Sequence, residues 1–480
     1  LQWYGLVFAA LCIGFIVFRF YLLQSSSQVI VWFDSVNMIS ISQESMWSKD
    51  FWFGNQPPFY PYFLKYFLNY TPVVCCASPL PGLIVEPANP LLSPQLFRFV
   101  VEYYALADIM VTQWIISVFS WIILALSLFQ RLSAPLLKLF AAVVIFSLGC
   151  ELSIVIWERN ILTESLSISF MLLISSLLIK GFDKNSKALF IFLLVSFVLF
   201  VNLRVTHIYF LIFTTLWLLM TLYRIKKFNW LIALVIFTSF FVFLNQYTLF
   251  SAKRSFIPIR SIVSSRIMSP GYEDIRSYFE SNGMPSVPES IVGKLWHGPF
   301  ADYPDLNEWI NNDAGKLYQK YLITHPGYFF LKPFVRYNEA NESLPDVFVP
   351  TLAWQTPTDH KGWNLFFTNE VLYLLILFPA IVGFRYVRKQ ELIVNTHLVS
   401  LGLFLMASGF LIALINWHAD LVELNRHVLP SMLQIRLGIL ILLFGVFDLR
   451  FSDVISGWGV HRRFLWESDV VSTGKGGKQR

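Results

Sequence analysis

Charged residues are scarce in this chain of 480 residues: they make up 14% of it, against 56% apolar and 17% aromatic residues. Soluble domains carry about 25% charged residues, so this composition excludes a soluble protein of such length. The mean hydropathy of +0.59 agrees with that exclusion. The composition therefore predicts a polytopic helical membrane protein.

Cysteine is also rare, since the chain has only four, and four cysteines do not make a disulfide scaffold. The sequence holds no Walker loop, no dinucleotide-binding fingerprint and no nucleophile elbow. Energy for any reaction must therefore arrive in the substrate. No internal repeat is visible, which weakens the case for a transporter built from duplicated halves.

Apolar runs of about 18–25 residues recur along the chain, the length needed to cross the hydrocarbon core of a bilayer. Ten spans are expected, near residues 3–23, 104–128, 136–156, 165–180, 188–203, 208–223, 229–250, 366–386, 397–417 and 428–448. Lys and Arg concentrate in the connections near 129–135, 181–187, 224–228 and 387–396. By the positive-inside rule, these connections and both termini are expected to be cytoplasmic. Orientation explains the net charge of +6, so nucleic acid is not an expected partner.

The spans divide the chain into four expected parts. They are an N-terminal transmembrane bundle over 1–250 that includes a first outer loop at 24–103, an extracytoplasmic cap over 251–365, C-terminal transmembrane helices over 366–450 and a cytoplasmic tail over 451–480. Within the cap, apolar residues from Leu306 to Leu322 recur at helical spacing, and that helix is expected to stop before Pro326. Glu273 to Asn282, closed by Gly283, predicts another short helix.

Charged residues gather at the helix ends that this topology places on the outer face. Charge at a membrane boundary is costly unless it is paired or faces water, so it usually marks a working site. The candidates are Asp34 after the first span, Glu158, Arg159 and Glu164 after the third, Arg204 and His207 after the fifth, and His418, Asp420, Glu423, Arg426 and His427 after the ninth, with Arg436 deeper in the last span.

Each cluster also has a plainer interpretation. Asp34 could cap the following helix, because Asp is a favoured N-cap residue. Glu164 could simply begin the fourth span, with Arg159 neutralised by Glu158. Arg204 could extend to the lipid headgroups. Arg436 lies too deep for that and needs an anionic partner, either a lipid phosphate or an internal acid.

A metal centre is left open. His418, Asp420 and Glu423 match no common zinc signature in their spacing, so substrate hydrogen bonding or ion pairing is preferred for them. Carboxylates that meet in a partly dry cleft could either deprotonate a hydroxyl or hold a divalent ion. The sequence therefore identifies no metal ligands, and it leaves open whether the protein uses a divalent cation as a cofactor.

The layout resembles the GT-C superfamily of integral-membrane glycosyltransferases, in its protein-mannosyltransferase and lipid A aminoarabinose transferase branch. The resemblance is carried by Asp34 just past the first span, the segment Pro57-Pro58-Phe59-Tyr60-Pro61 and the acidic opening of a later span at Arg159 to Glu164. The stretch from His418 to Pro430 looks like the family's last outer loop. Two positions depart from the family. Many members have an acidic residue where this chain has Ser35, and many have Asp where it has Glu164.

The resemblance implies transfer of a sugar from a polyprenyl-phosphate donor to an acceptor hydroxyl on a lipid, glycan or protein, at the extracytoplasmic face of the plasma or inner membrane. Asp34 would be the general base, and the anomeric configuration would be inverted. Arg204, Arg426 and Arg436 would stabilise charge on the departing phosphate. Glu164 would orient the sugar or the acceptor.

Two other classes of function stay open. A lipid or polysaccharide transporter would also gather charge in the membrane, but near the midplane and with broken helices. A non-catalytic subunit of a membrane complex would use the aromatic-rich outer loops as a docking surface. In that case Asp34 and Glu164 would point apart or be buried against unrelated helices.

Overall fold

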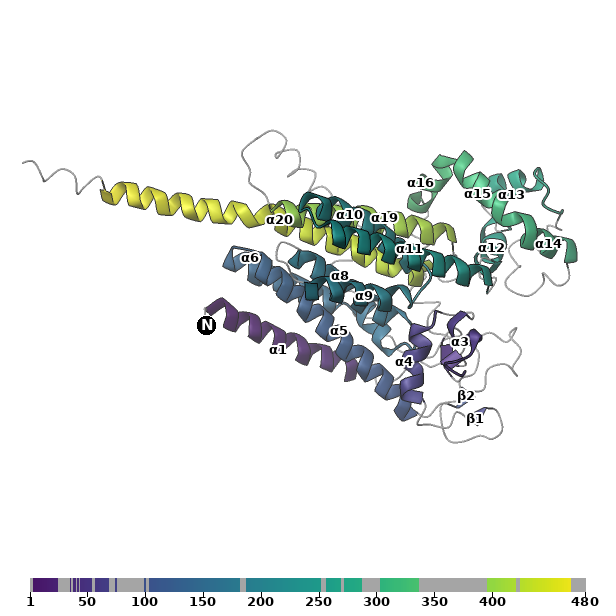
Figure 1. Cartoon of the computed structure of the whole chain (residues 1–480), viewed down its shortest axis with the longest axis horizontal. Coiled ribbons are helices and arrows are strands. Elements are labelled where there is room, and N and C mark those ends of the chain that lie inside the picture. The colour runs from purple at the N-terminus through teal and green to yellow at the C-terminus, as the bar shows by residue number, and fades with distance from the viewer. Residues whose placement is uncertain are drawn as a thin grey trace, which may run out of the picture.

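The fold is that of a computed structural model, in which a bundle of long helices carries short elements at one end (Figure 1). The structure describes residues 3–24, 35, 38–39, 41–42, 44–53, 57–68, 74–75, 99–100, 103–181, 187–251, 256–268, 272–286, 303–335, 395–419 and 424–467. Apart from one pair of two-residue strands, the regular structure of these residues is helical. The predicted span at 366–386 lies outside them.

The long helices match the other nine predicted spans in order and position. They are α1 (Trp3–Gln24), α5 (Tyr103–Arg131), α6 (Pro135–Gly149), α8 (Glu164–Lys180), α9 (Lys187–Val201), α10 (His207–Arg224), α11 (Phe228–Ser251), α19 (Thr396–Ala419) and α20 (Leu424–Glu467). Among the described residues, six helices are long and apolar enough to cross a membrane: α1, α5, α10, α11, α19 and the His427–Asp448 part of α20. The chain is thus an α-helical membrane protein, while the total of ten spans stays a prediction.

One predicted boundary was wrong. The third span was expected to reach residue 156, but α6 ends at Gly149 and is followed by α7 (Leu152–Val155) and the 3₁₀ turn η1 (Ile156–Arg159). A Cβ on Gly149 would lie 2.9 Å from the Trp121 ring, so the chain passes close to α5 there. The last span, predicted at 428–448, lies at His427–Asp448, and the helix α20 that contains it continues to Glu467.

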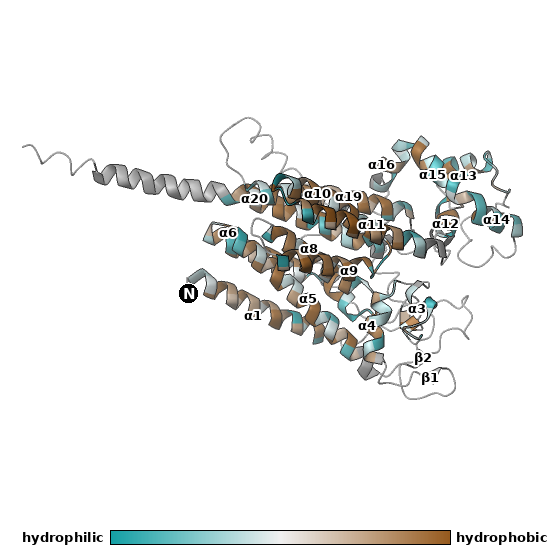
Figure 2. Cartoon of the chain, in the orientation of Figure 1, coloured by the Kyte–Doolittle hydropathy of each residue, from teal (hydrophilic) through white to brown (hydrophobic). Residues whose placement is uncertain are grey.

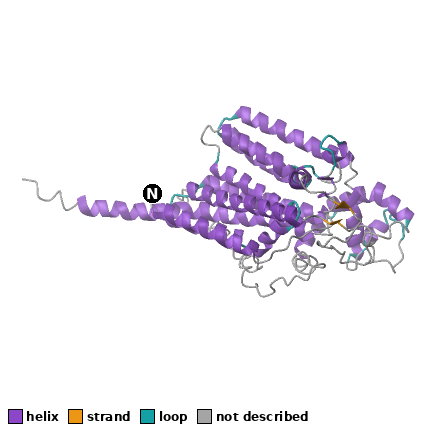
Figure 3. Ribbon diagram, turned by 90° about the horizontal axis from the view of Figure 1, so that it is seen from below, coloured by secondary structure: helices purple, strands orange, loops and turns teal. Residues whose placement is uncertain are grey.

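Short elements lie together at the end of the bundle opposite the N-terminus (Figures 1 and 3). From residues 24–103 come α3 (Lys49–Phe53), α4 (Phe59–Leu68) and the antiparallel strands β1 (Val74–Cys75) and β2 (Phe99–Val100). From residues 251–365 come α12 (Phe256–Ile262), η2 (Val263–Ile267), α13 (Glu273–Glu280), α14 (Pro304–Trp309), η5 (Ile310–Ala314), α15 (Gly315–Thr324) and α16 (Pro326–Val335).

The helices expected in the cap are confirmed. The apolar repeat from Leu306 to Leu322 forms α14, η5 and α15, which end before Pro326. A new helix, α16, starts at that proline, because proline suits the first helical position. The helix α13 ends in a turn at Gly283, whose φ of 99° is a conformation that glycine adopts without strain.

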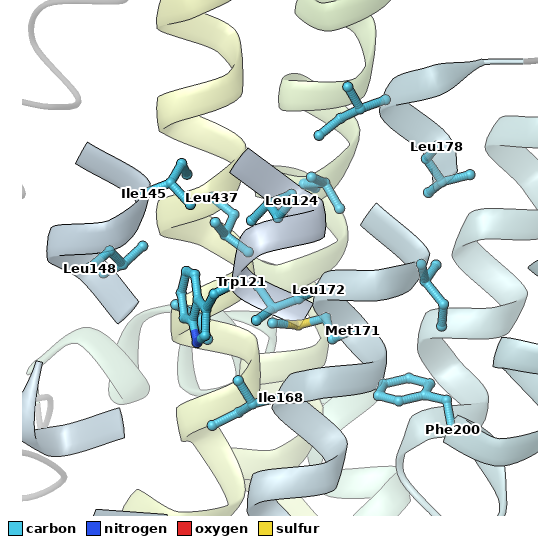
Figure 4. Packing of buried hydrophobic residues seen from close by; sticks show 14 of the residues in the cluster. Trp121, Leu124, Ile145, Leu148, Ile168, Met171, Leu172, Leu178, Phe200 and Leu437 are labelled. Atoms are coloured by element: carbon cyan, nitrogen blue, oxygen red, sulfur yellow. The ribbon is translucent and has the colours of Figure 1, made fainter. Parts of the chain in front are cut away.

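Apolar side chains of α5, α6, α8, α9 and α20 pack together inside the bundle. Trp121 lies at the centre of this core, among Ile145, Leu148, Ile168 and Leu437 (Figure 4). The bundle helices are brown with apolar residues along their length, whereas α13 to α15 are largely hydrophilic at the surface (Figure 2). On α1 and α11 many large apolar side chains are exposed, the pattern of helices that face lipid.

Glycines hold α19 and α20 in close contact. A Cβ on Gly402 would lie 2.6 Å from the backbone nitrogen of Leu442, and one on Gly438 would lie 2.7 Å from that of Met406. Lipid is as apolar as leucine, so helices in a membrane associate through close packing of small residues. These glycines therefore fix α19 and α20 as one antiparallel pair.

Candidate functional site

Three buried pairs of Arg and Glu side chains lie at the end of the bundle that carries the short elements. Arg19 pairs with Glu158, Arg204 with Glu164 at 3.3 Å, and Arg436 with Glu151 at 3.7 Å. None of the six residues is more than 8% exposed. A buried charge is tolerated only with a partner, so these pairs fix which helix ends meet there.

Arg204 joins three segments that are far apart in the sequence. It lies in the turn between α9 and α10, faces Glu164 at the start of α8, and contacts the Nδ1 atom of His427 near the start of α20. Glu164 is the first residue of α8, as the plainer interpretation of that residue expected, and is fully buried. The positive end of the helix dipole favours a carboxylate in this first turn.

His207 is the first residue of α10, where it is held by Phe200. Its Nδ1 atom bonds to the Phe200 carbonyl at 2.8 Å, and the two rings stack 3.9 Å apart at 1°. A carbonyl only accepts, so Nδ1 carries the proton. The hydrogen bond and the stacking therefore fix the orientation of the His207 ring.

The charges of Glu158 and Arg159 act on each other, as the plainer interpretation expected, but their hydrogen bonds go to α1. They are neighbours in the 3₁₀ turn η1, where successive side chains point about 120° apart. Glu158 pairs with Arg19 of α1, while Arg159 donates to the carbonyls of Leu22 and Leu23 at the end of α1. Together they hold η1 against the end of α1.

Arg436 has an internal partner, one of the two alternatives that the sequence left open. Its guanidinium lies 3.7 Å from a carboxylate oxygen of Glu151, which follows the last turn of α6. An arginine deep in a helix of this kind normally pairs within the protein. The pair joins α20 to the end of α6.

Gln113 of α5 connects η1 to the first outer loop. Its amide nitrogen donates to the carbonyls of Glu158 and Asn160, both at 3.0 Å, and its oxygen accepts from the Tyr60 hydroxyl at 3.0 Å. Burial raises the pKa of Tyr60 well above its ordinary value, and the negative charge of Glu164 raises it further. Tyr60, from the Pro-Pro segment, is thus a neutral donor to Gln113 on which the charge of Glu164 acts.

His418 lies apart from Arg204, at the end of α19. Its Nε2 atom bonds to the Phe329 carbonyl at 2.9 Å, and its Nδ1 atom lies 3.1 Å from the Tyr318 hydroxyl. Both ring nitrogens therefore have partners inside the protein.

Several predicted site residues are not described. Asp34, Asp420 and Glu423 lie outside the described residues, and Arg426 belongs to α20 with its side chain undescribed. Within the described part of the chain, no group of three or more His, Cys, Asp and Glu side chains is arranged to hold a metal ion. The open question of a cation therefore rests on residues outside that part.

Sequence reasoning missed five residues of this region: Arg19, Tyr60, Gln113, Glu151 and Arg266. For Arg19 and Gln113 a signal existed, since each is a lone polar residue within an apolar run and must have a partner. Glu151 directly follows the apolar run of α6 and could have been found in the same way. Tyr60 and Arg266 lie in outer segments where such residues are ordinary.

Comparison with models of protein families found none that matches the chain, and a search of curated proteins likewise found no match.

Proposed function

We propose that the chain is a membrane glycosyltransferase of the GT-C type, which moves a sugar from a polyprenyl-phosphate donor to an acceptor hydroxyl at the extracytoplasmic face. The observation that supports this most directly is the meeting of Arg204, Glu164 and His427 at one end of the bundle. Each was a sequence candidate from a different helix end. Convergence of such residues is what a reaction site requires.

Asp34 is proposed as the general base that takes the proton from the acceptor hydroxyl. It is ten residues beyond Gln24, the last residue of α1, and α1 ends at the carbonyls that Arg159 binds. That tether supports a position near the charged end of the bundle. The hydroxyl oxygen would then attack the anomeric carbon, while the bond from that carbon to the phosphate oxygen breaks with inversion.

The cationic side chains would stabilise the departing phosphate. Arg204 already balances Glu164, so the group around it is close to neutral, and the basic residues Arg159 and Arg426 add positive charge at the same helix ends. Prearranged cations in a water-poor site stabilise a developing negative charge without reorganisation. Glu164 would orient the sugar or the acceptor.

The test is to incubate the purified protein in lipid nanodiscs with a panel of polyprenyl-phosphate sugars and candidate acceptors. Transfer is expected with one donor, and Asp34→Asn is expected to lose it while the melting temperature stays unchanged. Glu280→Gln, on the surface of α13, serves as the matched control that keeps full activity. Wild-type turnover by Asp34→Asn would remove Asp34 from the base role.

Arg426→Ala separates donor binding from acceptor binding. If its guanidinium contacts the phosphate, the KM for the lipid donor should rise more than the KM for the acceptor. Equal rises in both would argue against a phosphate contact.

The complete burial of Glu164 favours a second candidate, a non-catalytic subunit of a membrane complex. The purified chain would then transfer no sugar from any donor, and Asp34→Asn would leave the activity of the complex unchanged. Both results together would replace the first proposal with the second.

A further inference from the structure

The cap has a hydrophobic core of its own. Here the cap is the unit formed by α12, η2, α13, α14, η5 and α15. Its buried side chains, among them Met268, Phe279, Trp309 and Ala314, form a cluster separate from the core of the bundle. Units with separate cores and a small shared interface are expected to move relative to each other.

A buried arginine of the cap lies at its contact with the bundle. The guanidinium of Arg266 lies 3.4 Å from the centre of the Trp417 ring, donates to the Trp417 carbonyl, and donates to the Tyr318 hydroxyl at 3.1 Å. Trp417 is in the last turn of α19, where a cation is favoured by the helix dipole. Arg266 is fully buried, so this charge lies at the interface and not in water.

The local backbone presents Arg266 to the bundle. It lies in η2, a π-helical turn closed by a bond from the Met268 nitrogen to the Val263 carbonyl. Such turns insert an extra residue into a helix and often mark functional positions. Val263 and Ile267, on either side of Arg266, are buried in the core of the cap.

His418 extends the junction. Arg266 donates to the Tyr318 oxygen, the Tyr318 hydroxyl lies 3.1 Å from Nδ1 of His418, and Nε2 of His418 bonds to the Phe329 carbonyl. Because the carbonyl only accepts, Nε2 of His418 carries a proton and donates it to Phe329. The ring also stacks on Phe329 of α16 at 4.8 Å.

The contacts of Arg266 with the end of α19 are connected to Arg204 through neighbouring residues. Asn416, next to Trp417 in the chain, donates to the carbonyl of His427 at 2.8 Å. The ring of His427 contacts Arg204. The position of the cap on α19 is thus connected, by packed and bonded groups, to the residues around Glu164.

We propose that the cap is a separately folded unit that moves on the bundle, and that Arg266 holds it in the docked position seen in the structure. Removal of the guanidinium releases the cap as an intact body from the end of α19. Release also frees the last turn of α19, where Asn416 donates to the carbonyl of His427. This device is independent of glycosyl transfer, and its test uses no substrate.

The experiment measures movement and folding separately in the full chain, in nanodiscs. Spin labels at Gln319 on the surface of α15 and Leu403 on the surface of α19, with the four native cysteines replaced, report the distance from cap to bundle. Arg266→Met keeps the aliphatic stem and removes the charge. Arg260→Met is the matched control, because Arg260 bonds to Asn307 within the cap at 2.7 Å.

For Arg266→Met, the distance distribution should gain a second, longer population, and amides of residues 414–419 should exchange with deuterium about tenfold faster. Exchange in α13 and α15 should stay at the wild-type rate, and Arg260→Met should leave the distance distribution unchanged.

Two results would overturn the proposal. An unchanged distance distribution in Arg266→Met means that the guanidinium does not hold the cap in place. Faster exchange throughout α13 and α15 means that Arg266 maintains the fold of the cap itself.

Discussion

The two ends of the helical bundle are held by different chemistry. At one end, three Arg–Glu pairs join α1, η1, α6, α8, α20 and the α9–α10 turn. At the other, Asp448 of α20 accepts from the Ser133 nitrogen at 2.6 Å, from its hydroxyl at 2.8 Å and from the Asn395 amide at 3.5 Å. There the carboxylate is satisfied by neutral donors of adjacent turns.

The two ends differ in the cost of losing one partner of an interaction. A neutral donor or acceptor left behind costs its own desolvation, whereas a buried ion left without its partner costs several times more. A buried pair adds little net stability over apolar residues of the same size. The three ion pairs therefore matter more for fixing the positions of their charged groups than for the net stability of the fold.

The largest effect should come from Arg19→Met. It leaves Glu158 buried without its cation and should destabilise the folded protein by about 3–5 kcal/mol. The measurement is thermal unfolding in nanodiscs, followed by intrinsic tryptophan fluorescence. The double variant Arg19→Met with Glu158→Leu should recover most of the loss, because the pair is then replaced by apolar side chains. A double variant no more stable than the single one would contradict this account.

A smaller effect is expected at the other end, from Asp448→Ala. The Ser133 nitrogen and hydroxyl lose their acceptor, which should cost about 1–3 kcal/mol. The same unfolding assay applies, and hydrogen exchange should rise near the α5–α6 turn and not at η1. A loss as large as that of Arg19→Met would remove the contrast between the two ends.

The smallest effect should come from Tyr60→Phe, which deletes one hydroxyl at the charged end and leaves all three ion pairs. The Gln113 oxygen loses a donor, at a cost of about 1 kcal/mol. If the glycosyltransferase proposal holds, turnover should fall more than stability does, because the charge of Glu164 acts on Tyr60. Gln113→Leu, which also frees the η1 carbonyls, should cost more stability than Tyr60→Phe; the reverse order would be inconsistent with the geometry.

Hydropathy located the helices because each apolar run is long and ends at polar residues. It failed at the end of α6, since residues 152–156 after Glu151 are again mostly apolar and continue the signal through a turn. That turn depends on contacts between Gly149 and Trp121 of α5. Contacts between distant segments leave no trace in a hydropathy profile.

The charged site was predictable as a set of candidates but not as a set of pairs. Glu164, Arg204 and His427 were identifiable, because each lies where an apolar run begins or ends. Glu158 was expected to neutralise its neighbour Arg159, and their charges do interact, but its hydrogen-bonded partner is Arg19, 139 positions away. Only the packing of α1 beside α6 and η1 determines that choice. The role of His418 likewise depends on where the cap lies against α19, which periodicity does not reveal.

All three acids of the charged end come from the short segment 151–164, while their arginines come from α1, the α9–α10 turn and α20. During synthesis, Arg19 already precedes this segment, so Glu158 finds its counterion at once. Glu164 must wait for Arg204, and Glu151 waits until Arg436 emerges more than 280 residues later. A carboxylate at a membrane boundary without a cation is costly. Insertion of the last hairpin is therefore the step that completes the neutralisation of a segment translated long before it.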